Sequence, residues 1–221
     1  MSVRSRVAGI TLIELLVVVG ILAILAALAG TAVLHGTARA RVSNAAFEVG
    51  ALYTAAQLRA TSRGVPHYVV FHDDGTDFGV YLLERPDALG AYDWAGADVV
   101  DEAQVRGTRV EDLHLSHESG LGFMDLDAPE LEPRPLPAPF ASIPLTAHGR
   151  GGLLGGCSFC TLGTGGARGV LRFSPDGTVR VMTGSTEPGG VIAFAPDTRD
   201  GQSGAPRVVV IASPAGAVRI F

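Results

Sequence analysis

Cys157 and Cys160 form a C-x-x-C pair, the arrangement in this sequence that comes closest to reactive chemistry. Such a pair can act as a redox dithiol when it opens a helix, because the helix N-terminus stabilises a thiolate. Here it lies in the run GGCSFCTLGTGG, with no predicted helix or βαβ unit around it, and two cysteines are too few for a four-ligand zinc site. In an oxidising compartment we expect a structural disulfide that fixes a local turn; redox or metal chemistry is the alternative.

Two further groups carry side chains of the kinds that bind metals. His114 and His117 are three residues apart, so in a strand they would point to opposite faces, and no other motif completes a site. The acidic run 73–77 lacks the twelve-residue ligand pattern and closing glutamate of a calcium loop. We interpret the histidines as solvated loop residues and the acidic run as a hairpin turn. The sequence also has no nucleophile triad motif, phosphate-binding loop or dinucleotide fingerprint, so we expect no enzyme activity, cofactor or bound metal.

The composition indicates a turn-rich, mostly β body with an aliphatic interior. Of the 221 residues, 47% are hydrophobic but only 6% aromatic, and there are 29 glycines and 13 prolines. All 17 basic residues are arginine, against 22 acidic residues, which gives a net charge of −5. No block of five or six basic residues occurs, so a nucleic-acid surface is not indicated.

The N-terminus places one carboxylate at the start of a long apolar run. Residues 1–9 carry two arginines, and from Leu15 to Leu34 no charged residue occurs for 20 positions, enough for a helix to cross about 30 Å of hydrocarbon. The arginines would keep the short N-terminal end in the cytoplasm and place the rest of the chain across the membrane. A secretory signal peptide cleaved before Gly30 and a simple signal anchor are the alternatives. Neither accounts for Glu14, because a charge in a membrane helix costs about 2.5–3.5 kcal/mol near the centre, less near the edge, and is usually functional.

The run from Gly9 to Glu14, GITLIE, resembles the class III signal of type IV prepilins and type II secretion pseudopilins, G-F-T-L-I-E, at five of six positions. The difference is Ile10, where phenylalanine is usual. The resemblance implies that a prepilin peptidase cleaves after Gly9 and methylates the new amine of Ile10. It also implies that Glu14 pairs with the Ile10 amine of a neighbouring subunit, although it could instead extend to the cytoplasmic interface.

One long helix is predicted over 10–62, with a membrane half (10–34) and an amphipathic half (35–62) that packs on a sheet. At about 1.5 Å per residue it would be roughly 80 Å long, and Gly64-Val65-Pro66 would end it. Phe47, Ala51 and Leu58 fall within about 40° of one another on the opposite side. They are either scattered surface residues or a second face that packs on helices of neighbouring subunits. The predicted sheet-facing stripe comprises Leu34, Ala38, Val42, Ala45, Val49, Leu52, Tyr53 and Ala56.

A β-rich domain is predicted over 66–221. Strands over 67–72 and 78–83 flank the Asp-Gly turn, and a third strand fits 108–115. The proline-rich run 129–144 and the glycine-rich run 149–169 are expected to be loop, within a loop-rich insertion over about 116–167. Order returns with strands over 169–173, 178–182, 191–195, 207–212 and 217–221, and we expect the last strand to be bound in a sheet.

The C-terminal half carries a second resemblance. RGVLRFSPDGTVRV, GGVIAF and RVVVIASPAGAVRIF, in this order after a pilin-like N-terminus, are similar to the H-type minor pseudopilins. The resemblance implies an α+β fold in which a long N-terminal transmembrane helix packs on antiparallel sheets. It implies a structural subunit of a type II secretion pseudopilus or a type IV pilus, with a cytoplasmic N-terminus, a single inner-membrane helix and a periplasmic C-terminal domain. Its partners would be other pilins or pseudopilins, the prepilin peptidase and the inner-membrane assembly platform.

Two alternatives belong to other classes of protein. One is a DNA-binding minor pilin for DNA uptake, since some relatives use a basic C-terminal end for this purpose. Here Ala217 stands where a basic residue is often found, and the processed chain would have 15 arginines, after loss of Arg4 and Arg6, against 22 acidic residues. The other alternative is a membrane-anchored thiol protein, which depends only on the C-x-x-C pair.

Overall fold

The computed structural model describes residues 12–73, 75, 78–84, 108–114, 120–131, 133–147, 149–163, 166–183, 188–197 and 205–221. Within these ranges, the side chains of 29–36, 38 and 108–114 are not described. The chain divides into two compact units, Met1–Thr37 and Ala38–Phe221, and the boundary falls inside helix α1 (Leu12–Arg63). The predicted long helix is therefore confirmed from residue 12 to its C-terminal end.

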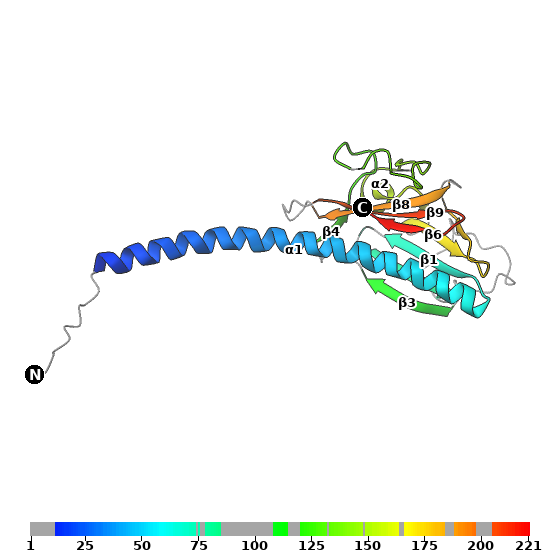
Figure 1. Cartoon of the computed structure of the whole chain (residues 1–221), viewed down its shortest axis with the longest axis horizontal. Coiled ribbons are helices and arrows are strands. Elements are labelled where there is room, and N and C mark those ends of the chain that lie inside the picture. Colours follow the sequence, from blue (N-terminus) through cyan, green and yellow to red (C-terminus); the bar gives the residue numbers. More distant parts are fainter. Residues whose placement is uncertain are drawn as a thin grey trace, which may run out of the picture. The chain divides into compact units, whose positions relative to one another are not determined.

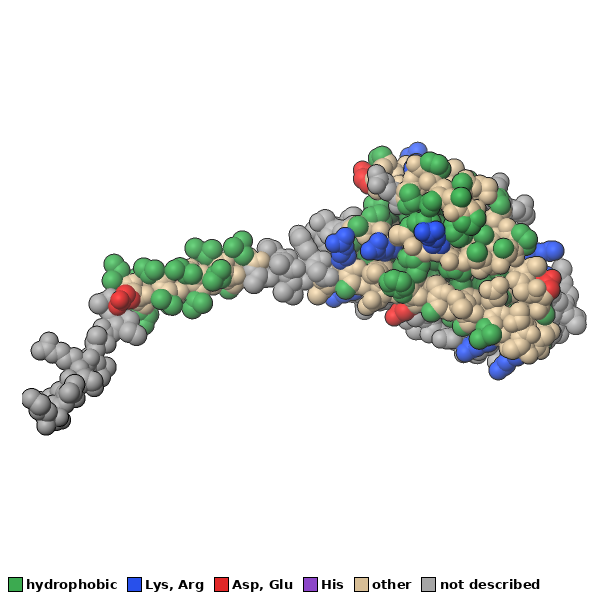
Figure 2. All heavy atoms as spheres, viewed as in Figure 1, with side chains coloured by type: hydrophobic (Ala, Val, Ile, Leu, Met, Phe, Trp, Pro, Cys, Tyr) green, Lys and Arg blue, Asp and Glu red, His purple; other side chains and the backbone are tan. Residues whose placement is uncertain are grey.

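The first unit contains the apolar part of α1, and its described side chains from 12 to 28 are all exposed. Because successive residues of a helix are about 100° apart, the consecutive residues 15–19 alone place apolar side chains on every side. Figure 2 shows hydrophobic side chains along the visible face of this segment. Among the described residues, no helix combines the length and the apolar composition that crossing a bilayer requires.

In the second unit, α1 buries one side against the sheets, as the predicted stripe requires. Every member of that stripe whose side chain is described is buried: Val42, Ala45, Val49, Leu52, Tyr53 and Ala56. The helix stops where predicted. Gly64 has φ +68°, a left-handed conformation that glycine adopts without steric cost, and its N–H donates to the Ala60 carbonyl at 3.0 Å.

The larger sheet contains the predicted hairpin. Its strands are β1 (His67–Asp73), β2 (Phe78–Glu84), β3 (Thr108–His114), β5 (Thr161–Gly163), β6 (Gly166–Phe173) and β7 (Val179–Val181). The order is β3-β2-β1-β6-β5, β7 also pairs with β6, and every pair is antiparallel. At the centre of the sheet, Val70 lies opposite both Tyr81 and Val170.

The smaller sheet contains most of the predicted C-terminal strands. Its strands are β4 (Leu121–Phe123), β8 (Gly189–Pro196), β9 (Arg207–Ala212) and β10 (Val218–Ile220), in the antiparallel order β10-β9-β8-β4. Beyond β10, Phe221 and Val208 exchange two backbone hydrogen bonds, so the last predicted strand is bound in a sheet. The α+β fold with antiparallel sheets is confirmed.

The C-terminal half of α1 and the inner faces of both sheets share one core (Figure 1). The Tyr53 ring of α1 lies 6.1 Å from the Phe71 ring and 6.0 Å from the Phe173 ring, measured between centroids. Burial raises the pKa of the Tyr53 hydroxyl far above its ordinary value.

The outer face of the smaller sheet is buried too. Residues 124–147, here called the covering segment, pack against it and form a second core. Arg134 Nη2 joins distant parts of this segment by donating to the carbonyls of Leu126 and Leu145. The buried side chains of the segment are Leu126, Leu131, Leu136, Phe140 and Ile143.

One loop prediction is confirmed and the other is wrong. The described residues of 129–144 form no helix or strand, as expected. The glycine-rich run 149–169, in contrast, contains α2 (Gly152–Gly156), β5 and the start of β6. Its glycines serve close packing: a Cβ on Gly156 would lie 2.8 Å from Cβ of Phe123, and one on Gly169 would lie 2.7 Å from the Phe159 ring. A short strand, β4, also lies within the predicted insertion.

Candidate functional site

The predicted processing site lies partly outside the described residues. Gly9 and Ile10 belong to the undescribed N-terminal residues, so their predicted cleavage and methylation stay predictions. Glu14 is described in the first turn of α1, and its side chain is exposed. It is the only aspartate, glutamate, lysine or arginine between Arg6 and Arg39. A carboxylate in this position interacts favourably with the positive end of the helix dipole.

In the second unit, α1 presents an uncharged strip on the side away from the sheets. The sequence placed Phe47, Ala51 and Leu58 there, and all three are exposed, with 61% of Phe47 and 67% of Leu58 accessible. Ala40 and Thr54 are also exposed and lie within about 40° of Phe47 around the helix. Thr54 donates its hydroxyl to the Gly50 carbonyl at 3.1 Å, which satisfies that hydroxyl within the helix. We call Ala40, Phe47, Ala51, Thr54 and Leu58 the outer strip.

Cys157 and Cys160 are joined by the predicted disulfide, with their Cα atoms 5.5 Å apart and both residues fully buried. The expectation that no helix lies beside the pair is wrong, because α2 ends immediately before Cys157. This position is the opposite of a reactive one: a helix C-terminus has partial negative charge and does not stabilise a thiolate. The buried bond also presents no sulfur to a substrate in solution.

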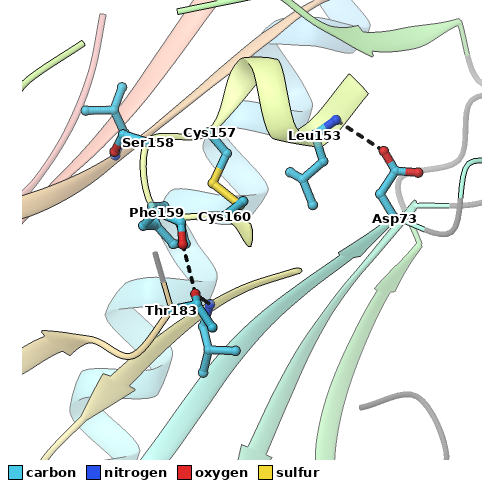
Figure 3. The surroundings of a disulfide bond; sticks show 9 residues. Asp73, Leu153, Cys157, Ser158, Phe159, Cys160 and Thr183 are labelled. Atoms are coloured by element: carbon cyan, nitrogen blue, oxygen red, sulfur yellow. Dashed lines mark hydrogen bonds between the residues drawn. A yellow bond between two sulfur atoms is a disulfide. The ribbon is translucent and has the colours of Figure 1, made fainter. Parts of the chain in front are cut away.

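Hydrogen bonds tie the disulfide loop to strands of both sheets (Figure 3). Ser158 N–H donates to the Val191 carbonyl of β8, and Val191 N–H donates to Ser158 Oγ, both at 2.9 Å. Thr183 Oγ1 donates to the Phe159 carbonyl at 2.8 Å and accepts from Val170 N–H of β6 at 2.8 Å. The hydrogen bonds of Ser158 and Thr183 could not be predicted from the sequence, because isolated hydroxyl residues are common in loops.

Asp73, at the start of the acidic turn, accepts a hydrogen bond from the backbone of α2. Asp73 accepts from Gly75 N–H at 2.8 Å, as in an Asx turn, and its other oxygen accepts from Leu153 N–H at 3.2 Å (Figure 3). Asp125 accepts from Gly151 N–H at 3.1 Å. No group of three or more potential metal ligands occurs among the described residues. The interpretation of His114 as a loop residue is wrong, because His114 is the last residue of β3; His117 lies outside the described residues.

Comparison with known protein families gives a match at the N-terminus. Residues 4–30 match the family model described as the prokaryotic N-terminal methylation motif, a range that includes Gly9, Ile10 and Glu14. No curated protein and no solved structure matches the chain. The methylation motif points to a type IV pilin-like or pseudopilin-like protein.

Proposed function

We propose that this protein is a minor pilin or pseudopilin, a structural subunit of a type IV pilus or a type II secretion pseudopilus. The observation that carries the proposal is the methylation motif over residues 4–30, with GITLIE at its cleavage position. On this proposal the prepilin peptidase cleaves after Gly9, and the Ile10 amine becomes the methylated N-terminus. The protein acts by assembly and has no catalytic role.

The exposed apolar side chains of the first unit support this proposal. Twelve large hydrophobic residues between 12 and 28 are at least half exposed, and burying each one contributes about 1.5–3 kcal/mol. Such a surface needs an apolar environment on all sides. We propose that the inner membrane provides it before assembly, and that the helices of other subunits provide it in the filament.

Glu14 fits the chemistry of such an assembly. Cleavage creates a cationic amine at Ile10, and a subunit that carries this amine into an apolar filament must compensate its charge. Glu14 is the one carboxylate in the apolar run, and we propose that it pairs with the Ile10 amine of a neighbour. The outer strip, with Phe47 and Leu58, is proposed as a second contact with neighbouring subunits, because its side chains are exposed and uncharged.

The disulfide is consistent with a periplasmic second unit, since such bonds persist in oxidising compartments. In this proposal the N-terminus is cytoplasmic, and the assembly platform of the inner membrane moves the subunit into the filament. Its partners are the other pilins or pseudopilins of that filament.

Intact mass spectrometry of the protein from its native membranes tests the proposal. The expected mass corresponds to a chain that starts at Ile10 with a methylated amine. A Gly9→Leu variant changes the residue before the proposed cleaved bond and should keep residues 1–9. A mature terminus at Gly30 would instead indicate an ordinary signal peptidase and would refute the pilin assignment.

A further inference from the structure

Arg219 of β10 is an exposed cation that stacks on an aromatic ring. Its guanidinium carbon lies 5.1 Å from the centroid of the Phe221 ring, and that ring makes an edge contact with Phe140 of the covering segment, with 6.2 Å between centroids. A guanidinium that stacks on a ring keeps its N–H groups free for a carboxylate. None of the described carboxylates forms an ion pair with Arg219.

β10 runs along one side of the outer strip. The side chains of Ile220 and Val218 lie 3.2 Å and 4.0 Å from the position that a Cβ on Gly50 would take. Gly50 is about 60° from Phe47 around α1, so β10 passes just beyond the strip in that direction. Side chains alternate along a strand, and Arg219 therefore points away from the contact that its two neighbours make with the helix.

A second cation lies on the same side of the strip. Arg39 is exposed and is within about 20° of Gly50 around the helix, one and a half to two turns beyond the strip's Phe47 toward the N-terminus. Like Arg219, it forms no ion pair with a described carboxylate. We call Arg39 and Arg219 the basic border of the outer strip.

Glu48 lies on the other side of the strip. It is about 100° from Phe47 in the direction opposite to Gly50, it is exposed, and it forms no ion pair with a described residue. Arg41 and Arg59 lie in the same direction around the helix, roughly 10 Å and 16 Å away along its axis, and both interact with other groups of the chain. The outer strip therefore separates an available carboxylate from two available guanidinium groups.

This arrangement fits a second copy of the same chain. From it we propose that Glu48 of one copy pairs with Arg219 of the next copy, while the outer strips of both copies face a common axis. Each copy then uses its carboxylate toward one neighbour and its basic border toward the other. A contact of this head-to-tail kind repeats along a helical filament unless the rotation closes a ring. Two carboxylates or two basic borders would repel each other, so the charges select this arrangement over a symmetric one. The inference rests on the proposed function, because it assumes that the copies assemble.

The chain offers a direct test because it contains no lysine. Arg219→Lys keeps the cation and introduces the only side-chain amine. Sheared filaments from the native host that carry this variant are treated with a water-soluble carbodiimide, which joins a carboxylate to an amine in contact with it. We expect a covalent dimer of the chain on a denaturing gel. Mass spectrometry should find an amide bond between Glu48 of one copy and the introduced lysine of the other.

Two further variants show which carboxylate reacts. Arg219→Lys with Glu48→Gln should give no dimer. Arg219→Lys with Glu130→Gln, which removes an exposed carboxylate of the covering segment, should give as much dimer as Arg219→Lys alone. A dimer that persists without Glu48, or an amide bond to another residue or to another protein, would overturn the inference.

Charge reversal tests the pairing without a reagent. Glu48→Arg and Arg219→Glu should each lower the amount of subunit in sheared filaments, and the two changes combined should restore it. The mass of each variant shows in the same samples whether residues 1–9 have been removed. Processed subunits that enter filaments, but give no Glu48 cross-link and no restoration by the double change, would refute this pairing and leave the proposed function intact. A chain that is neither processed nor found in filaments would refute both.

Discussion

Ile220 of the last strand lies directly against Gly50 of α1. A Cβ added to Gly50 would be 3.2 Å from Cδ1 of Ile220, and the Val218 side chain is at 4.0 Å. The absence of a side chain at this position lets β10 approach the helix. A glycine inside a helix costs roughly 0.5–1 kcal/mol relative to alanine, and here that cost accompanies contact with the C-terminal strand.

Replacement of Gly50 by leucine should therefore separate β10 from α1. We expect the free energy of unfolding to fall by about 1–3 kcal/mol, as for other overpacked sites. Denaturant titration of the full chain in detergent would measure the change. Adding Ile220→Ala should recover part of the loss, because the two side chains compete for one space. Strictly additive effects would show that the two residues are not in contact.

Glu14→Leu distinguishes a filament subunit from a simple anchored protein. The variant should insert at least as well as the wild type, because a costly carboxylate is removed. It should still be cleaved after Gly9, yet fail to co-purify with sheared filaments. Loss of one partner of a buried ion pair typically costs about 3–5 kcal/mol. Membrane fractionation gives the control, and normal incorporation of Glu14→Leu would exclude the pairing with Ile10.

Substitutions in the outer strip should affect assembly without affecting folding. Phe47→Ala and Leu58→Ala remove side chains that are mostly exposed, so the unfolding free energy should change by about 0.5 kcal/mol or less. The amount of subunit in sheared filaments should nevertheless fall. Leu52→Ala, on the buried side of the same helix, is the matched control and should cost about 2–5 kcal/mol. Unchanged incorporation of both outer-strip variants would mean that the strip is ordinary surface.

Replacement of both cysteines by serine should lower stability measurably. The closed loop is short, and the chain-entropy model assigns such a loop about 2 kcal/mol. Two buried hydroxyls add a further cost unless they find hydrogen-bond partners. Thermal or denaturant unfolding measures the loss, while filament incorporation should remain detectable. A serine variant that folds normally and loses all function would favour a thiol-based role.

Asp176, in the turn between β6 and β7, should titrate below its ordinary range. Its carboxylate accepts a hydrogen bond from the Thr178 hydroxyl at 2.6 Å, which lowers the pKa of the carboxyl; the Thr178 N–H bond adds to this. A lowered pKa in the folded state contributes stability above the unfolded-state value of about 3.9 and loses it as the pH falls through the folded-state value. Carboxyl NMR of the wild type and Thr178→Val should show a higher midpoint for the variant. Equal midpoints would contradict the assignment.

The elements that the sequence predicted well are those with a local pattern. The i+3 and i+4 spacing of apolar residues correctly predicted which side of α1 is buried. The Asp-Gly turn correctly predicted the β1–β2 hairpin. The glycine-rich run 149–169 was wrongly predicted to be a loop, because composition does not distinguish a glycine in a flexible loop from one that permits close packing. Gly169, beside Phe159, is of the second kind. The short strand β4 exists only through its pairing with β8, where Leu121 lies opposite Pro196, and no local pattern encodes such a partner.

The candidate site likewise has a part that the sequence predicts and a part that it does not. Cys157 and Cys160 could be paired from the sequence because no other cysteine exists. The hydroxyls of Ser158 and Thr183, which hold the loop in place, depend on strands far along the chain and could not be predicted.

The covering segment changes how the smaller sheet can be used. An antiparallel sheet with one face in the core usually alternates buried and exposed positions, but every residue of β8 is buried. The sheet is thus an inner layer, and its strands are insulated from any lateral neighbour on that face. Whatever approaches this face meets the exposed prolines Pro135, Pro137 and Pro139, which have no N–H to offer a strand. The segment therefore keeps another sheet from stacking on β8, because it leaves no residue of that strand exposed.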